Sequence, residues 1–253
     1  MSQENLSAKA AKAAAAAARQ EAAAIEQKRQ RKIRIIGGLV VVAVMAALIA
    51  IPVLSNKDAV VPSDAALPTG VTSDTYGVKV GSAWTAPDAD KIPVLQLWED
   101  FQCPFCKFFE DEMDEYIESL IRNKEAKVTY HMTSFLGMES KRATNAAYCA
   151  ADESRFIEFH KAIYAVQGAE NSGIFSNKNL IEIGKRLGIN SPTFESCVND
   201  NKYGDNVEKV YASMAKNKVE GTPTVFINGK LWSRSGSEFV LDEFKAAVEA
   251  AKK

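Results

Sequence analysis

The spacing of apolar residues changes along the chain and divides it into strands and helices. Residues 92–99 form an almost continuous apolar run, which is typical of a buried strand. Across 107–124 apolar side chains recur every three or four positions opposite an acidic face, which predicts an amphipathic helix. Further strands are predicted at 75–80, 126–132, 224–227 and 230–232, and further helices at 139–151, 154–167, 178–187, 192–199, 204–217 and 241–251. The order is β, β, α, β, five helices, β, β, α, which indicates an α/β fold.

Two dipeptides predict where elements begin or turn. Ser191-Pro192 predicts a helix start, because Ser caps the first N–H groups and Pro fits the first helical position. Asn228-Gly229 predicts a two-residue hairpin turn between the last two strands.

One apolar segment is longer than any core strand or short helix needs. Residues 35–54 are 20 uncharged residues, long enough to cross a bilayer as a helix. Residues 1–34 contain eight Lys or Arg and three Glu, and this basic flank predicts a cytoplasmic N-terminus. We interpret the segment as an uncleaved transmembrane signal anchor. The alternative is a cleaved signal peptide, whose apolar core is normally shorter.

The anchor divides the rest of the chain. The Ala- and Lys-rich residues 1–34 predict a solvated cytoplasmic tail, with partner binding as an alternative. Residues 55–74 contain Pro, Gly, Ser and Asp and predict a linker. Residues 75–253 are then an extracytoplasmic domain, because positive charge stays on the cytoplasmic side.

A Cys-x-x-Cys motif stands at the junction between the apolar strand and the amphipathic helix. Cys103-Pro104-Phe105-Cys106 can close a small disulfide ring and reopen it. A sulfur at a helix N-terminus meets unpaired N–H groups and the positive end of the helix dipole, which favour a thiolate. The motif therefore favours thiol–disulfide exchange.

Four cysteines permit three pairings, and Cys103 with Cys106 is one natural pair. Cys149 and Cys197 then remain for a structural disulfide, which persists outside the cytoplasm. It would close a loop of about 49 residues and contribute about 3–4 kcal/mol in the chain-entropy model. A buried pair of free thiols and a second redox pair are the alternatives.

Three sequence elements together resemble the DsbA-like branch of the thioredoxin superfamily. They are W-E-D-F-Q-C-P-F-C at 98–106, F-L-G at 135–137 and G-T-P-T-V-F-I-N-G at 221–229. The resemblance covers about residues 75–253. It implies a thioredoxin fold with an all-helical insertion at about 138–218.

The resemblance also implies roles for individual residues. Pro223 matches the family's cis-proline, which lies against the Cys-x-x-Cys motif, and Thr222 would pair with a substrate strand through its main chain. An ordinary turn proline is the alternative for Pro223. Cys103 would be the attacked sulfur and Cys106 the leaving thiolate.

Three residues near the motif refine this hypothesis. Phe105 stands where the family's strongest oxidants have His, so we expect helix N–H groups to hold the thiolate and the oxidant to be milder. Glu99 or Asp100 would relay protons to the inner cysteine, with Glu99 favoured. The alternative is a solvated or capping acid at the strand end.

The remaining composition disfavours a metal site and nucleic-acid binding. With His131 and His160 as the only histidines and one Cys-x-x-Cys, a zinc site is disfavoured and both histidines are expected to be structural. No basic stripe indicates nucleic-acid binding. We expect no cofactor beyond the redox-active disulfide.

The sequence hypothesis is a membrane-anchored thiol:disulfide oxidoreductase that introduces disulfides into unfolded exported proteins. The resemblance implies a quinone-linked membrane re-oxidase as partner, and an anchored oxidase favours an actinobacterial-type cell surface. The alternatives are a reductase or isomerase on the same scaffold, and a non-catalytic chaperone-like binding module.

Overall fold

The computed structural model describes residues 67–252. The predicted cytoplasmic tail, the signal anchor and most of the predicted linker lie outside this range. Within the described range no helix combines the length and the apolar character that crossing a membrane requires.

Five strands form one mixed sheet with the order β1-β3-β2-β4-β5. The strands are β1 Val78–Val80, β2 Val94–Glu99, β3 Lys127–Met132, β4 Thr224–Ile227 and β5 Lys230–Leu231. The central strand β2 is parallel to β3 and antiparallel to β4. The C-terminal end of β2 therefore lies beside the start of β4. The Cys-x-x-Cys motif follows β2 and Pro223 precedes β4, so the two meet at this edge of the sheet.

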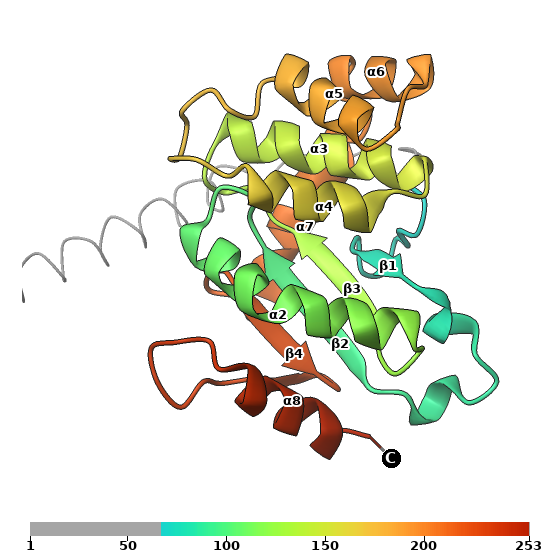
Figure 1. Ribbon diagram of the computed structural model, residues 1–253, viewed down its shortest axis with the longest axis vertical. Helices are drawn as coiled ribbons and strands as arrows, with labels where there is room; N and C mark the ends of the chain where they lie inside the picture. The colour runs from blue at the N-terminus through green and yellow to red at the C-terminus, as the bar shows by residue number, and fades with distance from the viewer. Residues whose placement is uncertain (1–66, 253) are drawn as a thin grey trace, which may run out of the picture. The chain divides into compact units, whose positions relative to one another are not determined.

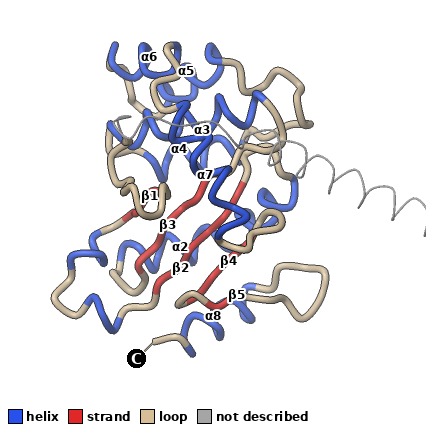
Figure 2. The backbone as a smooth tube through the Cα atoms, turned by 180° about the vertical axis from the view of Figure 1, so that it is seen from behind, coloured by secondary structure: helices blue, strands red, loops and turns tan. Residues whose placement is uncertain are grey.

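Helices cover both faces of this sheet and extend beyond one end of it. They are α2 Pro104–Arg122, α3 Met138–Asp152, α4 Phe156–Ala165, α5 Asn177–Arg186, α6 Pro192–Asn199, α7 Gly204–Lys216 and α8 Leu241–Ala250. Figure 1 shows α2 crossing in front of the sheet, and the view from behind in Figure 2 shows α7 on the other face. The five helices α3 to α7 follow one another between β3 and β4, as the sequence pattern predicts.

Helix α3 is the centre of the helical segment. All residues from Ala143 to Ala151 are buried, and α3 packs against α4, α5, α6 and α7. Five of these nine residues are Ala, whose small side chains allow other helices to approach from several sides. A disulfide between Cys149 and Cys197 joins α3 to α6, with 5.9 Å between the two Cα atoms.

Local motifs act as their chemistry predicts. Ser191 accepts a hydrogen bond from the N–H of Phe194 and caps α6, with Pro192 in its first turn. Asn228 and Gly229 adopt positive φ values of 49° and 75°, as a tight hairpin turn between antiparallel strands requires.

Two features differ from the expected boundaries. Helix α2 begins at Pro104 instead of 107, because Pro104 is well placed in a first turn and Cys103 occupies the N-cap. Packing also begins before Thr75: Val71 is buried, and Thr69 donates two hydrogen bonds to Asp152, each of 3.0 Å.

Candidate active site

The Cys-x-x-Cys motif occupies the first turn of α2. Cys103 is the N-cap, and its carbonyl accepts from the N–H groups of Cys106 (3.1 Å) and Lys107 (3.2 Å). Cys106 is fully buried, whereas Cys103 retains 7% exposure, and neither is in a disulfide. An incoming thiol therefore reaches Cys103 and not Cys106.

The two sulfurs are electrostatically unequal. A hydrogen bond with the Cys106 thiol, followed by interactions with Thr222 and with the N–H groups of Cys106 and Phe105, lowers the pKa of Cys103 to about 7. Burial raises the pKa of Cys106 well above its usual range, and the charges of Cys103 and Glu99 raise it further. The expectation that helix N–H groups are the main support of the thiolate is corrected, since the inner thiol contributes most.

Strand register brings the proline element to the cysteines. Trp98 near the end of β2 pairs with Thr224 at the start of β4, so the residues before Thr224 lie next to the motif. The Thr222-Pro223 peptide bond is cis. The carbonyl of Thr222 accepts a hydrogen bond from Cys103 Sγ at 3.5 Å.

Asp100 holds the loop between β2 and α2. Its carboxylate accepts from the Gln102 N–H (2.9 Å), the Ser140 hydroxyl (2.6 Å) and the Leu136 N–H (3.2 Å). Burial raises the pKa of Asp100 to about 6, and these donors oppose the rise. Asp100 therefore stabilises the loop through hydrogen bonds, as in the alternative interpretation of a capping acid at the strand end.

Residues of the helical segment also hold this loop in place through hydrogen bonds. The Gln167 side-chain amide donates to the carbonyls of Phe101 (2.7 Å) and Cys103 (3.1 Å). The Asn171 N–H donates to the side-chain oxygen of Gln102 at 2.6 Å. The backbone before the nucleophilic sulfur is thus positioned by residues more than 60 positions away.

Glu99 is fully buried and has a partner that the sequence did not reveal. His160 Nε2 lies 2.8 Å from Glu99 Oε2, and the Tyr164 hydroxyl lies 3.4 Å from the same oxygen. Burial raises the pKa of Glu99 to about 7. The carboxyl is thus poised to exchange a proton near neutral pH.

Glu110 is the second residue that sequence analysis missed. It is 4% exposed, and its Oε2 lies 3.9 Å from His160 Nδ1. A signal was available, because Glu110 stands four positions after Cys106 and therefore on the apolar face of α2 instead of the acidic one. No comparable signal marks His160, whose proximity to Glu99 arises from the tertiary fold.

The other histidine is structural, as expected. His131 stacks on Trp98 with ring centroids 4.1 Å apart, and burial lowers its pKa to about 4. Among the described residues, Glu99, Glu110 and His160 form the one group whose ligand atoms all lie within 4.8 Å. His160 Nε2 is at hydrogen-bond distance from Glu99, so hydrogen bonding accounts for this contact without a shared metal ion.

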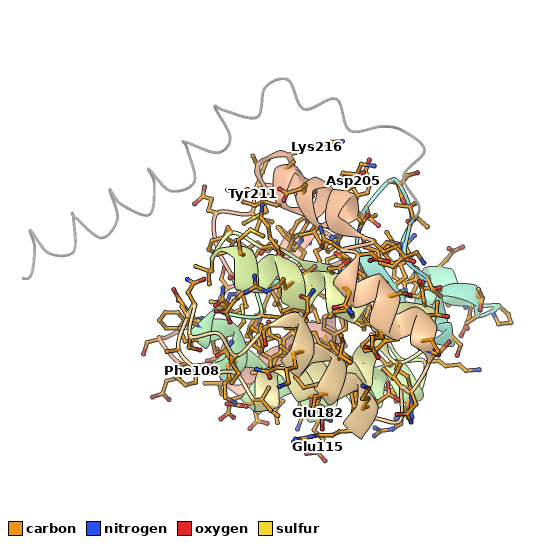
Figure 3. All side chains as sticks on the ribbon, turned by 90° about the horizontal axis from the view of Figure 1, so that it is seen from above. Phe108, Glu115, Glu182, Asp205, Tyr211 and Lys216 are labelled. Carbon is orange, nitrogen blue, oxygen red and sulfur yellow. A yellow bond between two sulfur atoms is a disulfide. The ribbon has the colours of Figure 1, made fainter. Side chains whose placement is uncertain are left out.

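Exposed aromatic side chains flank the motif. Phe105 and Phe108 are 59% and 56% exposed, with their rings 6.3 Å apart. Figure 3 shows Phe108 at the periphery of the molecule. Trp232 packs on Phe244, with ring centroids 5.0 Å apart, and on Phe109, with ring centroids 6.4 Å apart. The apolar surface beside Cys103 thus comes from α2.

A sulfur of lowered pKa that retains slight exposure, a fully buried partner thiol and a facing cis-proline on a five-stranded sheet define a class, the thiol–disulfide oxidoreductases of thioredoxin fold. Known proteins agree with this assignment, since residues 86–250 match the thioredoxin family. The disulfide bond oxidoreductase DsbG of Mycobacterium tuberculosis is 30% identical and superposes with a TM-score of 0.57 over 69% of this chain and 86% of its own.

The oxidised DsbA of the same bacterium is also 30% identical, with a TM-score of 0.57 over 69% of this chain and 92% of its own. A protein of Rickettsia typhi classed as a protein-disulfide oxidoreductase is 26% identical over 154 residues, which are 59% of this chain. This chain covers 54% of that relative's length, about half. The chain belongs to the thioredoxin family, among its DsbA-like oxidoreductases.

Proposed function

We propose that this chain oxidises thiol pairs in unfolded exported proteins, with the Cys103–Cys106 disulfide as the oxidant. The observation that carries the proposal is the inequality of the two sulfurs. Cys103 retains some solvent exposure and has a pKa of about 7. Cys106 is fully buried, and its pKa is raised well above its usual range. A stabilised Cys103 thiolate favours the reduced enzyme, so the oxidised enzyme gives up its disulfide readily.

The reaction proceeds in two exchanges. A substrate thiolate attacks Cys103 Sγ, forms a mixed disulfide and expels Cys106 as a thiolate, which then takes a proton from Glu99. A second substrate thiolate attacks the substrate sulfur of the mixed disulfide and expels Cys103 as a thiolate. The substrate loses two electrons and gains a disulfide, and the enzyme keeps both electrons as a dithiol.

Several features support the substrate class and the location. The exposed pair Phe105 and Phe108 offers apolar surface to an unfolded chain, and Thr222 offers backbone groups to an extended one. The apolar run at 35–54 and its basic flank support a membrane anchor with the domain outside, where the Cys149–Cys197 disulfide is stable. Return to the disulfide form then requires a membrane re-oxidase, for which a quinone-linked partner is the implied class.

One observation favours a second candidate, a reductase on the same scaffold. A Cys103 pKa of about 7 matches the thioredoxin value, whereas a strong oxidant such as DsbA holds its thiolate near 3.5. Phe105 contributes no positive charge or hydrogen-bond donor that would lower the value further.

The test is oxidative refolding of reduced ribonuclease by the oxidised full-length chain, followed by recovered nuclease activity. We expect disulfide transfer with Cys103→Ser inactive. A redox equilibrium with glutathione as reducing as that of structural disulfides overturns the oxidase direction and favours the reductase. Labelling of reduced Cys103 in intact cells by a membrane-impermeant maleimide tests the location, and protection until the cells are lysed contradicts it.

A further inference from the structure

The connection between α4 and α5, residues 166–176, lies beside the start of α2 (Figure 1). Its Gln167 side chain donates from Nε2 to the carbonyl of Phe101 at 2.7 Å and to the carbonyl of Cys103 at 3.1 Å. One amide nitrogen thus places its two N–H bonds on the two carbonyls that flank Gln102. The amide is uncharged, and the exchange reaction proposed above does not use it.

The connection is fixed by hydrogen bonds at both of its ends. The buried Glu139 carboxylate on α3 accepts from the N–H groups of Gly173 (2.7 Å) and Phe175 (2.9 Å). At the other end, the backbone N–H of Gln167 donates to the carbonyl of Tyr164 in the last turn of α4, at 3.2 Å. Because the backbone is already held, the Gln167 side chain loses little further freedom when it binds the active-site loop.

The carbonyl oxygen of Cys103 has more donors than it needs. It accepts from the N–H groups of Cys106 (3.1 Å) and Lys107 (3.2 Å) at the start of α2, and from Gln167 Nε2 at 3.1 Å. A carbonyl oxygen has two lone pairs, so two donors satisfy it. One of the three donors can therefore turn to another acceptor without leaving this carbonyl unpaired.

The N–H of Cys106 is the donor that has another acceptor. Together with the N–H of Phe105 it also interacts with Cys103 Sγ, and both interactions lower the pKa of Cys103. Hydrogen bonds to a charged acceptor are stronger than those to a neutral one, so the thiolate attracts this N–H more than the thiol does. When Cys103 ionises, its carbonyl keeps the donors from Lys107 and Gln167.

We propose that Gln167 is a positioning residue for Cys103, whose amide binds the Cys103 carbonyl and so leaves the first N–H groups of α2 free to hold the thiolate. The amide acts through the backbone, since its two hydrogen bonds end on carbonyl oxygens. The inference rests on the proposed function in one respect, which is that Cys103 is the sulfur that exchanges. The helical segment thereby tunes the reactivity of a motif that lies on the sheet.

The redox equilibrium of the motif depends on this hydrogen bond. In the equilibrium with glutathione, two glutathione thiols lose two electrons and two protons and become glutathione disulfide, while the Cys103–Cys106 disulfide gains them and becomes a dithiol. A better-stabilised thiolate favours the dithiol. Without the Gln167 amide, the Cys103 carbonyl competes with the sulfur for the N–H of Cys106. The thiolate is then less stable, and the equilibrium moves toward the disulfide.

The test compares full-length Gln167→Met with the matched control Gln96→Met, the same change at a half-buried position in the middle of β2. Met is similar in length to Gln and has no N–H donor. Because both side chains are uncharged, the ionisable neighbours of Cys103, such as Cys106 and Glu99, are retained. Thiolate absorbance at 240 nm gives the pKa of Cys103, and equilibration with glutathione at pH 8 gives the redox equilibrium.

We expect Gln167→Met to move the absorbance midpoint of Cys103 upward by about one pH unit, which is the order of one hydrogen bond to a charged group. With the wild-type midpoint at about 7, the equilibrium constant for reduction of the motif at pH 8 should fall about fivefold. Gln96→Met should match the wild type in both measurements.

The outcomes separate a positioning role from a structural one. A Gln167→Met chain that unfolds at lower urea concentration but keeps the wild-type midpoint and equilibrium overturns the inference and leaves the proposed function intact. An equal shift in Gln96→Met also overturns it, because the effect is then not specific to this amide. If Gln167→Met does not fold, Gln167→Asn, whose amide is one methylene shorter, replaces it with the same expected changes. A wild-type motif that does not equilibrate with glutathione overturns both proposals.

Discussion

Replacing Glu99 with Gln should make the reduced protein more stable at alkaline pH, although it removes the carboxyl group that we propose as proton donor to Cys106. Gln is neutral and nearly isosteric, and its amide can still donate a hydrogen bond to His160. Wild-type Glu99 has an ordinary pKa of 4.5 in the unfolded chain and about 7 in the folded one, because burial penalises its charged form. The folded chain therefore holds this proton over a pH range in which the unfolded chain has already released it.

The sign and the magnitude follow from proton linkage. Since the folded carboxyl binds the proton more tightly, wild-type stability falls as pH rises from 4.5 and the loss is complete above about 7. The interval between the two pKa values corresponds to about 3 kcal/mol. Below pH 4.5 both chains carry a neutral side chain and should be equally stable, whereas at pH 8 the variant should be more stable by up to about 3 kcal/mol.

The assay is urea unfolding of the reduced full-length chains, followed by tryptophan fluorescence at half-unit steps from pH 4.5 to 8.5. Glu112→Gln provides the control for loss of a surface charge on the same helix. A difference between Glu99→Gln and the wild type that stays constant across this range would refute the reasoning. It would mean that Glu99 is not the group that holds the buried proton.

Three further predictions concern the cysteines. Cys106→Ala should raise the pKa of Cys103 above about 7, because the inner thiol is its largest support, and the pH dependence of iodoacetamide alkylation measures it. Phe105→His should lower the pKa of Cys103 below about 7 by adding a donor or positive charge, and an unchanged thiolate absorbance midpoint at 240 nm would contradict this. The double variant Cys149→Ala/Cys197→Ala should lose about 4 kcal/mol of unfolding free energy, because the disulfide joins residues 48 positions apart. Urea unfolding measures the loss, and a variant as stable as the wild type would show that the disulfide restricts the unfolded chain little.

The sequence predicted the strands and helices well where hydrophobic periodicity is strong. The parallel pairing of β2 with β3 needs a connecting helix, and α2 supplies it with an apolar stripe that includes Phe109, Met113 and Ile117. The two short 3₁₀ helices at Ser82–Thr85 and Ala89–Lys91 were not predicted. They are too short for a periodic pattern and depend on loop packing.

The candidate site was predictable as far as its chemistry is local. The cysteines, the proline element and Glu99 stand in short motifs, so residue identity and spacing revealed them. His160 was not predictable, because its distance of 2.8 Å from Glu99 spans 61 positions and follows from how α4 packs on α2. Glu110 was missed for another reason. A glutamate within a charged helix is usually exposed, and only its position on the same helix face as the apolar residues indicates that it is buried.

The hydrogen bonds between the active-site loop and the helical segment have a consequence for evolution and engineering. Asp100 and Gln102 take their partners from Ser140, Leu136 and Asn171, all beyond the first βαβ unit. The loop therefore cannot be moved to another protein on its own. A chimera that joins it to a foreign helical segment would leave buried polar groups without hydrogen-bond partners. In related chains we expect residues at these positions to change together, so that exchanging both segments at once preserves folding where exchanging either one does not.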